Sequence, residues 1–150
     1  MRRAIALSRK GMQSNEGGPF GAVVVKDGEI IAEGNNRVTS TNDPTAHAEV
    51  VAIRNACKNL NTFQLEGCTI YTSCEPCPMC LGAIYWARPE KLFYACTKND
   101  AAKIGFDDDF IYKEIDLEEK DRSIKTIQIL NAEGNEVFKE WAAKIDKVDY

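Results

Sequence analysis

Residues 20–35, which read FGAVVVKDGEIIAEGN, decide the fold that we expect for this chain. The run from Phe20 to Val25 is almost continuously apolar, which is typical of a strand that is buried on both faces of a sheet. Asp27-Gly28 then predicts a tight hairpin turn. A second strand over about residues 29–35 completes the hairpin. A β-sheet with covered faces is therefore the expected centre of the structure.

Helical patterns lie on both sides of this hairpin. Residues 2–14 predict a helix with basic residues on its outer face. Asp43-Pro44 predicts the start of a second helix, with Asp43 as its cap and Pro44 at the first helical position. A third helix begins between Pro76 and Pro78 and is apolar nearly all round, which predicts burial. The last segment carries apolar residues at helical spacing.

Strand patterns alternate with these helices. Beyond the hairpin, we expect strands at residues 68–72, 91–95 and 124–130. No repeat, linker or low-complexity segment divides the chain. The alternation predicts one α/β domain over residues 1–150, with three layers (α/β/α) and a central five-stranded mixed sheet.

The composition limits the class of protein. The 150 residues suffice for one ordinary core, and 44% hydrophobic with 28% charged residues are globular values. No apolar run approaches the roughly 20 residues needed to cross a bilayer. The apolar stretch near the N-terminus is broken at once by Ser8 and Arg9, unlike a signal peptide. We therefore expect a cytoplasmic protein without membrane contact. The net charge of −4 favours a small neutral substrate over a nucleic-acid backbone.

Two short motifs carry the chemistry that we expect. His47-Ala48-Glu49 lies near one helix start, and Cys77 and Cys80 lie three residues apart at another, so both sulfurs reach one ion. Helix N-termini favour thiolates. Three protein ligands leave a tetrahedral zinc with one position for water, which is the pattern of a catalytic site. Glu49, beside the metal but not bound to it, is the candidate that moves protons. We predict one zinc ion per subunit.

Each motif alone has a simpler interpretation. A lone histidine such as His47 is more often structural, and a single Cys-x-x-Cys is often a redox pair or half of a zinc ribbon. A four-cysteine ribbon would need Cys74 and an unrelated cysteine, because no second Cys-x-x-Cys separate from Cys77 and Cys80 is present. His-Ala-Glu followed by Pro-Cys-x-x-Cys is moreover the known signature of zinc nucleobase deaminases. The remaining cysteines, Cys57, Cys68, Cys74 and Cys96, are assigned to packing.

At these residues the sequence resembles the cytidine deaminase superfamily, and most closely the small bacterial guanine deaminases. The resemblance is carried by GPFGA at 18–22, NDPTAHAE at 42–49, TSCEPCPMCLGAIYWA at 72–87 and GFDD at 105–108, and it covers nearly the whole chain. It implies a hydrolase with a cytidine-deaminase-like fold that converts guanine to xanthine and ammonia, with zinc-bound water attacking carbon 2 and Glu49 as proton shuttle.

The same resemblance assigns further roles by position. Asn36 would hydrogen-bond the purine base, and Phe20 and Trp86 would line the pocket. Asp108 would accept from the ring's donor edge and assist a second proton transfer, and Tyr150 would close the site. The C-terminal segment, about residues 124–150, would be exchanged between two subunits in a domain-swapped homodimer.

Without the resemblance, these residues have ordinary interpretations. Asp108 would belong to a solvated acidic loop, Asn36 to a turn, Phe20 and Trp86 to the core, and Tyr150 to a frayed terminus. A tRNA-specific adenosine deaminase with the same zinc site is the first alternative, although the mixed charges of the final helix disfavour it. A deaminase of cytosine or another small heterocycle is the second. The third is a structural zinc module, in which Glu49 would have no purpose.

Overall fold

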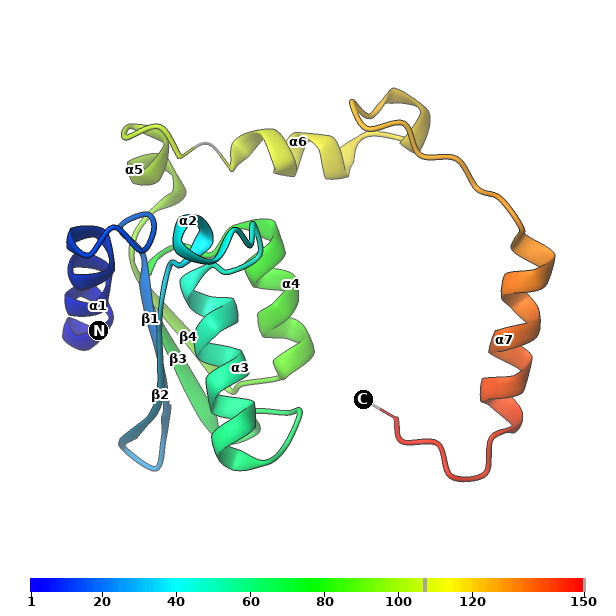
Figure 1. Ribbon diagram of the computed structural model, residues 1–150, viewed down its shortest axis with the longest axis horizontal. Helices are drawn as coiled ribbons and strands as arrows, with labels where there is room; N and C mark the ends of the chain where they lie inside the picture. The colour runs from blue at the N-terminus through cyan, green and yellow to red at the C-terminus, as the bar shows by residue number, and fades with distance from the viewer. Residues whose placement is uncertain (107, 150) are drawn as a thin grey trace. The chain divides into compact units, whose positions relative to one another are not determined.

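The computed structural model describes residues 1–106 and 108–149, and the chain divides into two compact units, residues 1–109 and 110–150. The first unit contains, in chain order, α1 (Arg2–Gln13), β1 (Gly21–Lys26), β2 (Glu29–Asn35), α2 (Val38–Thr41), α3 (Ala48–Leu60), β3 (Cys68–Cys74), α4 (Pro78–Ala87), β4 (Lys91–Cys96) and α5 (Lys98–Ala102) (Figure 1). The second contains α6 (Asp109–Asp116), which begins at the boundary, η1 (Glu119–Asp121) and α7 (Asn131–Ala143).

The hairpin predicted from residues 20–35 is confirmed. Strands β1 and β2 pair antiparallel, and Asp27 and Gly28 make the turn with φ of 51° and 83°. Positive φ at both central residues matches the right-handed twist of the flanking strands. The first four residues of β1 are buried, as expected for a strand covered on both faces.

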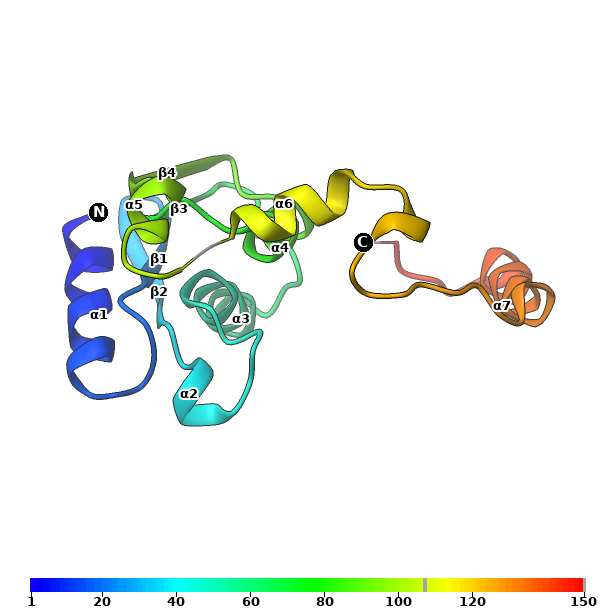
Figure 2. The same ribbon diagram turned by 90° about the horizontal axis from the view of Figure 1, so that it is seen from above.

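Within the part of the chain that the structure describes, the sheet has four strands, in the order β2-β1-β3-β4. Strand β3 runs antiparallel to β1 and parallel to β4, so the sheet is mixed, as predicted. Helix α1 covers one face, and α3 and α4 cover the other, which gives the expected three α/β/α layers (Figures 1 and 2). The prediction of five strands is wrong. Residues 124–130 form no strand, because a strand needs a hydrogen-bonded neighbour and these residues have none among the described ones.

The core lies between the sheet and helix α3, and the two elements pack very closely. A Cβ added to Gly34 of β2 would lie only 2.3 Å from the carbonyl oxygen of Ala48, the first residue of α3. No larger residue fits there without moving the helix. The buried side chains of this core include Ala22, Val24, Ala52, Leu65 and Ile70. This contact fixes where α3 begins relative to the sheet, and therefore where His47 lies.

Helix α4 is only partly buried, in contrast to the prediction. Cys80, Ile84 and Ala87 face inward. Tyr85 and Trp86 are 75% and 64% exposed. An apolar surface all round the helix thus leaves one aromatic face uncovered in the single chain.

The second unit has helices without a core of their own. None of its described residues in α6, η1 and α7 is buried, and apolar side chains such as Ile124, Ile127 and Phe138 are more than 70% exposed. Local bonds shape it: the guanidinium of Arg122 donates to the carbonyl oxygens of Glu114 and Leu117. Among the described residues of both units, no helix combines the length and the apolar character that crossing a bilayer requires.

Candidate active site

Three predicted metal ligands come together at the N-terminal ends of α3 and α4. The ligand atoms of His47, Cys77 and Cys80 all lie within 4.8 Å of one another. Nδ1 of His47 is 3.6 Å from Sγ of Cys77 and 3.5 Å from Sγ of Cys80. Tetrahedral coordination with Zn–S of about 2.3 Å and Zn–N of about 2.1 Å separates nitrogen and sulfur by about 3.6 Å. The residues present therefore fit a zinc ion bound by one imidazole and two thiolates.

The backbone explains why the ligands converge. His47 and Cys77 are the N-cap residues of α3 and α4, both extended, and Pro78 occupies the first position of α4. Proline is favoured there because that position has no helical acceptor for an N–H. Cys80 then lies one turn in, on the same side as Cys77. Both helices begin at the carboxyl end of β3, and their N–H dipoles favour the thiolate form of the ligands.

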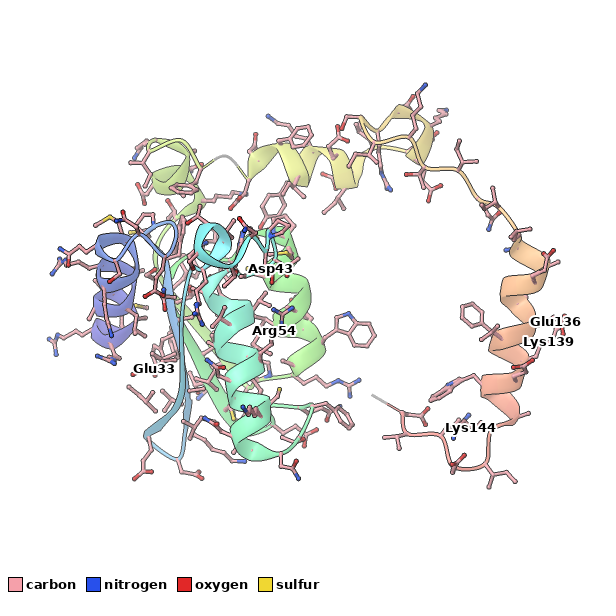
Figure 3. The ribbon with its side chains drawn as sticks, in the orientation of Figure 1. Glu33, Asp43, Arg54, Glu136, Lys139 and Lys144 are labelled. Atoms are coloured by element: carbon pink, nitrogen blue, oxygen red, sulfur yellow. The ribbon has the colours of Figure 1, made fainter. Side chains whose placement is uncertain are left out.

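The helix of His47 begins later than predicted. Asp43 and Pro44 form a turn, and α3 begins only at Ala48. Oδ1 of Asp43 accepts hydrogen bonds from the N–H (2.8 Å) and hydroxyl (2.6 Å) of Thr45, so its carboxylate closes a local turn instead of capping a helix. Its other oxygen lies 3.6 Å from Nη1 of Arg54 in α3, which ties this turn to the helix (Figure 3).

Glu49 lies beside the ligands and is almost fully buried, at 5% exposure. The hydroxyl of Thr72 donates to its Oε1 at 2.6 Å, and the thiol of Cys80 donates to its Oε2 at 3.4 Å. Burial raises the pKa of Glu49, while the bond from Thr72 acts in the opposite direction. A carboxylate with these properties is held in one orientation and takes up a proton readily.

The pKa values of the two thiols move in opposite directions. Hydrogen bonding with Cys80 and His47 lowers the pKa of Cys77 to about 4, despite burial. The pKa of Cys80 is raised, chiefly by its hydrogen bond to Cys77, and that of His47 is raised by its own bond to Cys77. A cation at this position would stabilise both thiolates, so we expect metal binding to release the proton that the Cys80 thiol carries.

A cavity of about 270 Å³ opens in front of these groups. It is lined by Gly18, Phe20, Asn36, Val38, Thr39, His47, Glu49, Cys74, Glu75, Cys77, Phe106 and Asp108. The rings of Phe20 and Phe106 meet edge to face with centroids 4.8 Å apart and form an apolar wall. The carboxylate of Asp108 faces the same space, and its charge helps to raise the pKa of His47. The cavity thus combines an apolar wall with acceptors and an amide.

The predicted residues divide into three groups. His47, Glu49, Cys77 and Cys80 form the metal cluster, and Phe20, Asn36 and Asp108 line the cavity beside it. Trp86 does not lie there: it is on the exposed face of α4 and is not among the described residues that line the cavity. Tyr150 lies outside the described residues.

Sequence reasoning missed two residues of the site. Thr72 holds Glu49, and Phe106 packs on Phe20. The signal for Thr72 was the alternation of β3: Ile70 and Thr72 share a buried face, and a polar residue at a core position needs a partner. Phe106 belongs to the GFDD stretch that carries the resemblance, but its ring was assigned no role in the site.

This fold and cluster define a zinc-dependent deaminase. A profile of the cytidine and deoxycytidylate deaminase zinc-binding region matches residues 1–96, and the chain belongs to this family. Over all 150 residues it is 57% identical to the guanine deaminase of Bacillus subtilis (strain 168), covering 96% of that protein. The X-ray structure of B. subtilis guanine deaminase matches 99% of the chain and 95% of its own at 58% identity, with a TM-score of 0.97.

Other relatives match over shorter stretches. A tRNA-specific adenosine deaminase of Aquifex aeolicus (strain VF5) is 51% identical over 77 residues, which is 51% of each chain. A structure of the guanine deaminase from Nitrosomonas europaea is 36% identical, covers 71% of this chain and 62% of its own, and has a TM-score of 0.68.

Proposed function

We propose that this chain is a zinc-dependent guanine deaminase, a hydrolase that converts guanine and water to xanthine and ammonia. One observation carries this proposal: the similarity to the B. subtilis guanine deaminase extends over the whole chain, whereas the A. aeolicus tRNA-specific adenosine deaminase matches only half of it. The zinc motif is common to the wider family and does not distinguish substrates. The assignment of guanine as the substrate therefore rests on how much of the chain the similarity covers.

The chemistry of the proposal centres on Glu49. Zinc held by His47, Cys77 and Cys80 supplies a Lewis acid that lowers the pKa of a water molecule. Glu49 accepts a proton from the attacking water and returns it to the substrate, and one carboxylate serves for both transfers because it does not move between them. Its burial excludes bulk water from the exchange, and Thr72 keeps Oε1 in place.

Recognition of guanine requires groups that match its edges. The base offers donors at ring nitrogen 1 and at the exocyclic amine, and the carboxylate of Asp108 accepts from them. Asn36 provides an amide donor for a ring acceptor, and Phe20 supports the ring plane. A site with acceptors for these donors disfavours bases that lack donors at these positions, such as adenine.

The proposal includes a homodimer in which about residues 124–150 are exchanged between subunits and the chain is otherwise one domain. The exposed apolar side chains of the second unit support it, because side chains such as Ile127 and Phe138 have no cover of their own. In this dimer, Trp86 would line a substrate pocket and Tyr150 would close an active site. A chain ending at residue 123 is expected to be monomeric in light scattering, and a monomeric full-length protein would contradict the dimer.

A cytoplasmic location is also part of the proposal. All six cysteines are free thiols in the structure, and two of them are zinc ligands in the proposal. Such thiols suit a reducing compartment, since an oxidising one would favour disulfides.

A substrate panel tests the assignment. Zinc-loaded protein is incubated with guanine, adenine, cytosine, guanosine and an unmodified tRNA, and ammonia release is measured. We expect turnover of guanine far above that of the other substrates. Turnover confined to the tRNA would replace the proposal by tRNA adenosine deamination, and turnover of cytosine alone would assign a pyrimidine deaminase.

A further inference from the structure

The amide of Asn36 is fixed on one side by two backbone donors. Its Oδ1 accepts from the N–H of Gly18 and from the N–H of Val38, both at 3.2 Å. Two N–H donors identify this atom as the oxygen, so the NH₂ half of the amide is the part available to the cavity that Asn36 lines. The two donors belong to different segments, namely the loop before β1 and the start of α2. The orientation of the amide therefore depends on how these two segments are held together.

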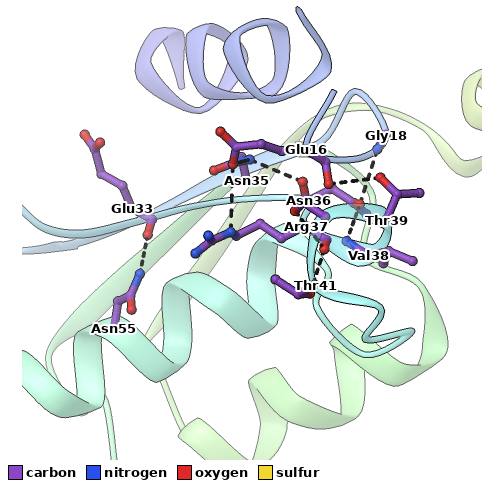
Figure 4. Close-up of polar contacts among 11 residues, drawn as sticks. Glu16, Gly18, Glu33, Asn35, Asn36, Arg37, Val38, Thr39, Thr41 and Asn55 are labelled. Atoms are coloured by element: carbon purple, nitrogen blue, oxygen red, sulfur yellow. Dashed lines mark hydrogen bonds and ion pairs between the residues drawn. The ribbon is translucent and has the colours of Figure 1, made fainter. Parts of the chain in front are cut away.

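Glu16 holds them together through its side chain and its backbone (Figure 4). Its Oε2 accepts from Nδ2 of Asn35 at 2.9 Å and lies 3.8 Å from Nε of Arg37, so it contacts the residues on either side of Asn36. Its carbonyl oxygen accepts from the hydroxyl of Thr39 and from the N–H of Ser40, both at 3.1 Å. We call Glu16, Asn35 and Arg37 the Glu16 clasp.

The loop before β1 packs directly against Asn36 where the Glu16 clasp holds it. A Cβ added to Gly17 would lie 2.2 Å from Oδ1 of Asn36 and 2.6 Å from its carbonyl oxygen. Asn35 strengthens the contact, because its Nδ2 also donates to the carbonyl oxygen of Asn36 at 3.2 Å. A small displacement of this loop would therefore move the amide itself.

We propose that Glu16 is a positioning residue for substrate binding: the Glu16 clasp holds the Asn36 amide in the orientation that donates to the bound base. The inference rests on the proposed function, because Asn36 is placed on the substrate there. The N–H of Arg37 donates to the carbonyl oxygen of Ala46, next to His47, at 2.9 Å. This bond uses the backbone alone and does not involve the side chain of Glu16, so we expect a change at Glu16 to act on binding and to leave the proton transfers of Glu49 unchanged.

The acceptor oxygen of Glu16 matters more than its charge. Side chains of Glu16 and Arg37 are 34% and 50% exposed, and an ion pair in such a position contributes little. Glu16→Gln retains an oxygen for Asn35, whereas Glu16→Leu removes it at similar size. We expect Glu16→Leu to raise KM by about threefold to tenfold, the worth of one or two hydrogen bonds. We expect kcat within about twofold of wild type, and Glu16→Gln close to wild type in both.

A matched control lies on the same strand as Asn35. Glu33 of β2 pairs with Arg3 and is 35% exposed, close to the exposure of Glu16, but is not part of the clasp (Figure 4). Glu33→Leu, the same substitution as in the test variant, should leave KM unchanged. Steady-state kinetics are measured on zinc-loaded protein, together with zinc content and melting temperature.

Two results would overturn the proposal: an unchanged KM in Glu16→Leu, whether or not kcat falls, or an equal rise of KM in Glu33→Leu. If Glu16→Leu does not fold, Asn35→Leu removes the other half of the same bond and must raise KM alone. In a double variant the two effects must be less than additive, because both substitutions remove the hydrogen bond between Glu16 and Asn35. If the wild type acts on a base other than guanine, the same comparison is made on that base, so failure of the substrate assignment and failure of the clasp are separate results.

Discussion

Replacing Thr72 by valine should show how much of the activity depends on the orientation of the Glu49 carboxylate, because Glu49 itself is retained. Thr72 is fully buried, and its hydroxyl donates to Oε1 of Glu49 at 2.6 Å. Valine has nearly the same shape, so the substitution removes this bond without leaving a large cavity. A hydrogen bond to a charged group contributes about 1.5–3 kcal/mol. At about 1.4 kcal/mol for each factor of ten, kcat/KM at neutral pH should fall by about tenfold to a hundredfold.

The pH dependence gives the sign of the effect. Glu49 must be ionised to accept the first proton. Burial raises its pKa and the bond from Thr72 lowers it, so Thr72→Val should raise the pKa further. A smaller fraction of Glu49 is then ionised at a given pH. The acid limb of the kcat/KM profile should therefore move to higher pH, and activity should recover partly as the pH rises.

The assay is ammonia release from guanine over a range of pH, with zinc content measured on each sample. Thr72→Ser, which keeps a hydroxyl, should retain most activity. Thr69→Val makes the same substitution on the same strand and should leave the profile unchanged. A Thr72→Val enzyme with full zinc content and a wild-type profile would refute the reasoning.

Four further results are expected. Glu49→Gln should lower kcat by about 10²–10⁴-fold while zinc remains bound, and wild-type turnover would remove Glu49 from the mechanism. Removing zinc with a chelator should abolish turnover. It should also lower the melting temperature by about 5–10 °C in calorimetry, because the metal binds the folded chain. An unchanged melting temperature would contradict the metal cluster. Burial raises the pKa of Cys74 to about 11, so its thiol is protonated at pH 8. Mass spectrometry should show that this thiol resists iodoacetamide in the native holoenzyme and reacts with it in urea. Rapid labelling of the native protein would contradict the burial of Cys74. Asp108→Asn should raise KM for guanine more than for purines without the exocyclic amine, and an equal change for all bases in the kinetics would remove Asp108 from recognition.

The parts of the fold that depend on local chemistry could be predicted from the sequence. The apolar run from Phe20 to Val25 and the Asp27-Gly28 turn specify a buried hairpin without reference to the remainder of the chain. The helix start at Asp43 was wrong for a reason equally local: Thr45, two residues on, offers the carboxylate two closer donors. A pattern can identify a capping residue, but it cannot say which donors that residue will meet.

The fifth strand shows a limit of a different kind. Ile124, Ile127 and Ile129 are β-branched residues with a high preference for strands. A strand nevertheless forms only beside a partner, and the described part of the single chain provides none for these residues. Propensity is a property of a segment, whereas pairing is a property of the whole structure.

The metal cluster could be predicted because the spacing of its ligands in the sequence decides whether they can bind one ion. Cys77 and Cys80 reach one ion only if they are about one helical turn apart. No comparable spacing in the sequence predicts which aromatic residues form the wall of the cavity. Trp86 and Phe106 are both aromatic, and only the packing places Phe106 against Phe20 and leaves Trp86 on the exposed face of its helix.

Helix α3 begins next to a zinc ligand and ends far from it, which bears on how the enzyme could be engineered. Its 13 residues span about 20 Å at 1.5 Å per residue, from Ala48 to the left-handed Asn61 that terminates it. Thr62 and Phe63 beyond it are exposed. A foreign peptide or reporter domain inserted between them would be carried about 20 Å from the catalytic groups, so this loop is a place where the deaminase could be tethered or tagged without disturbing its chemistry.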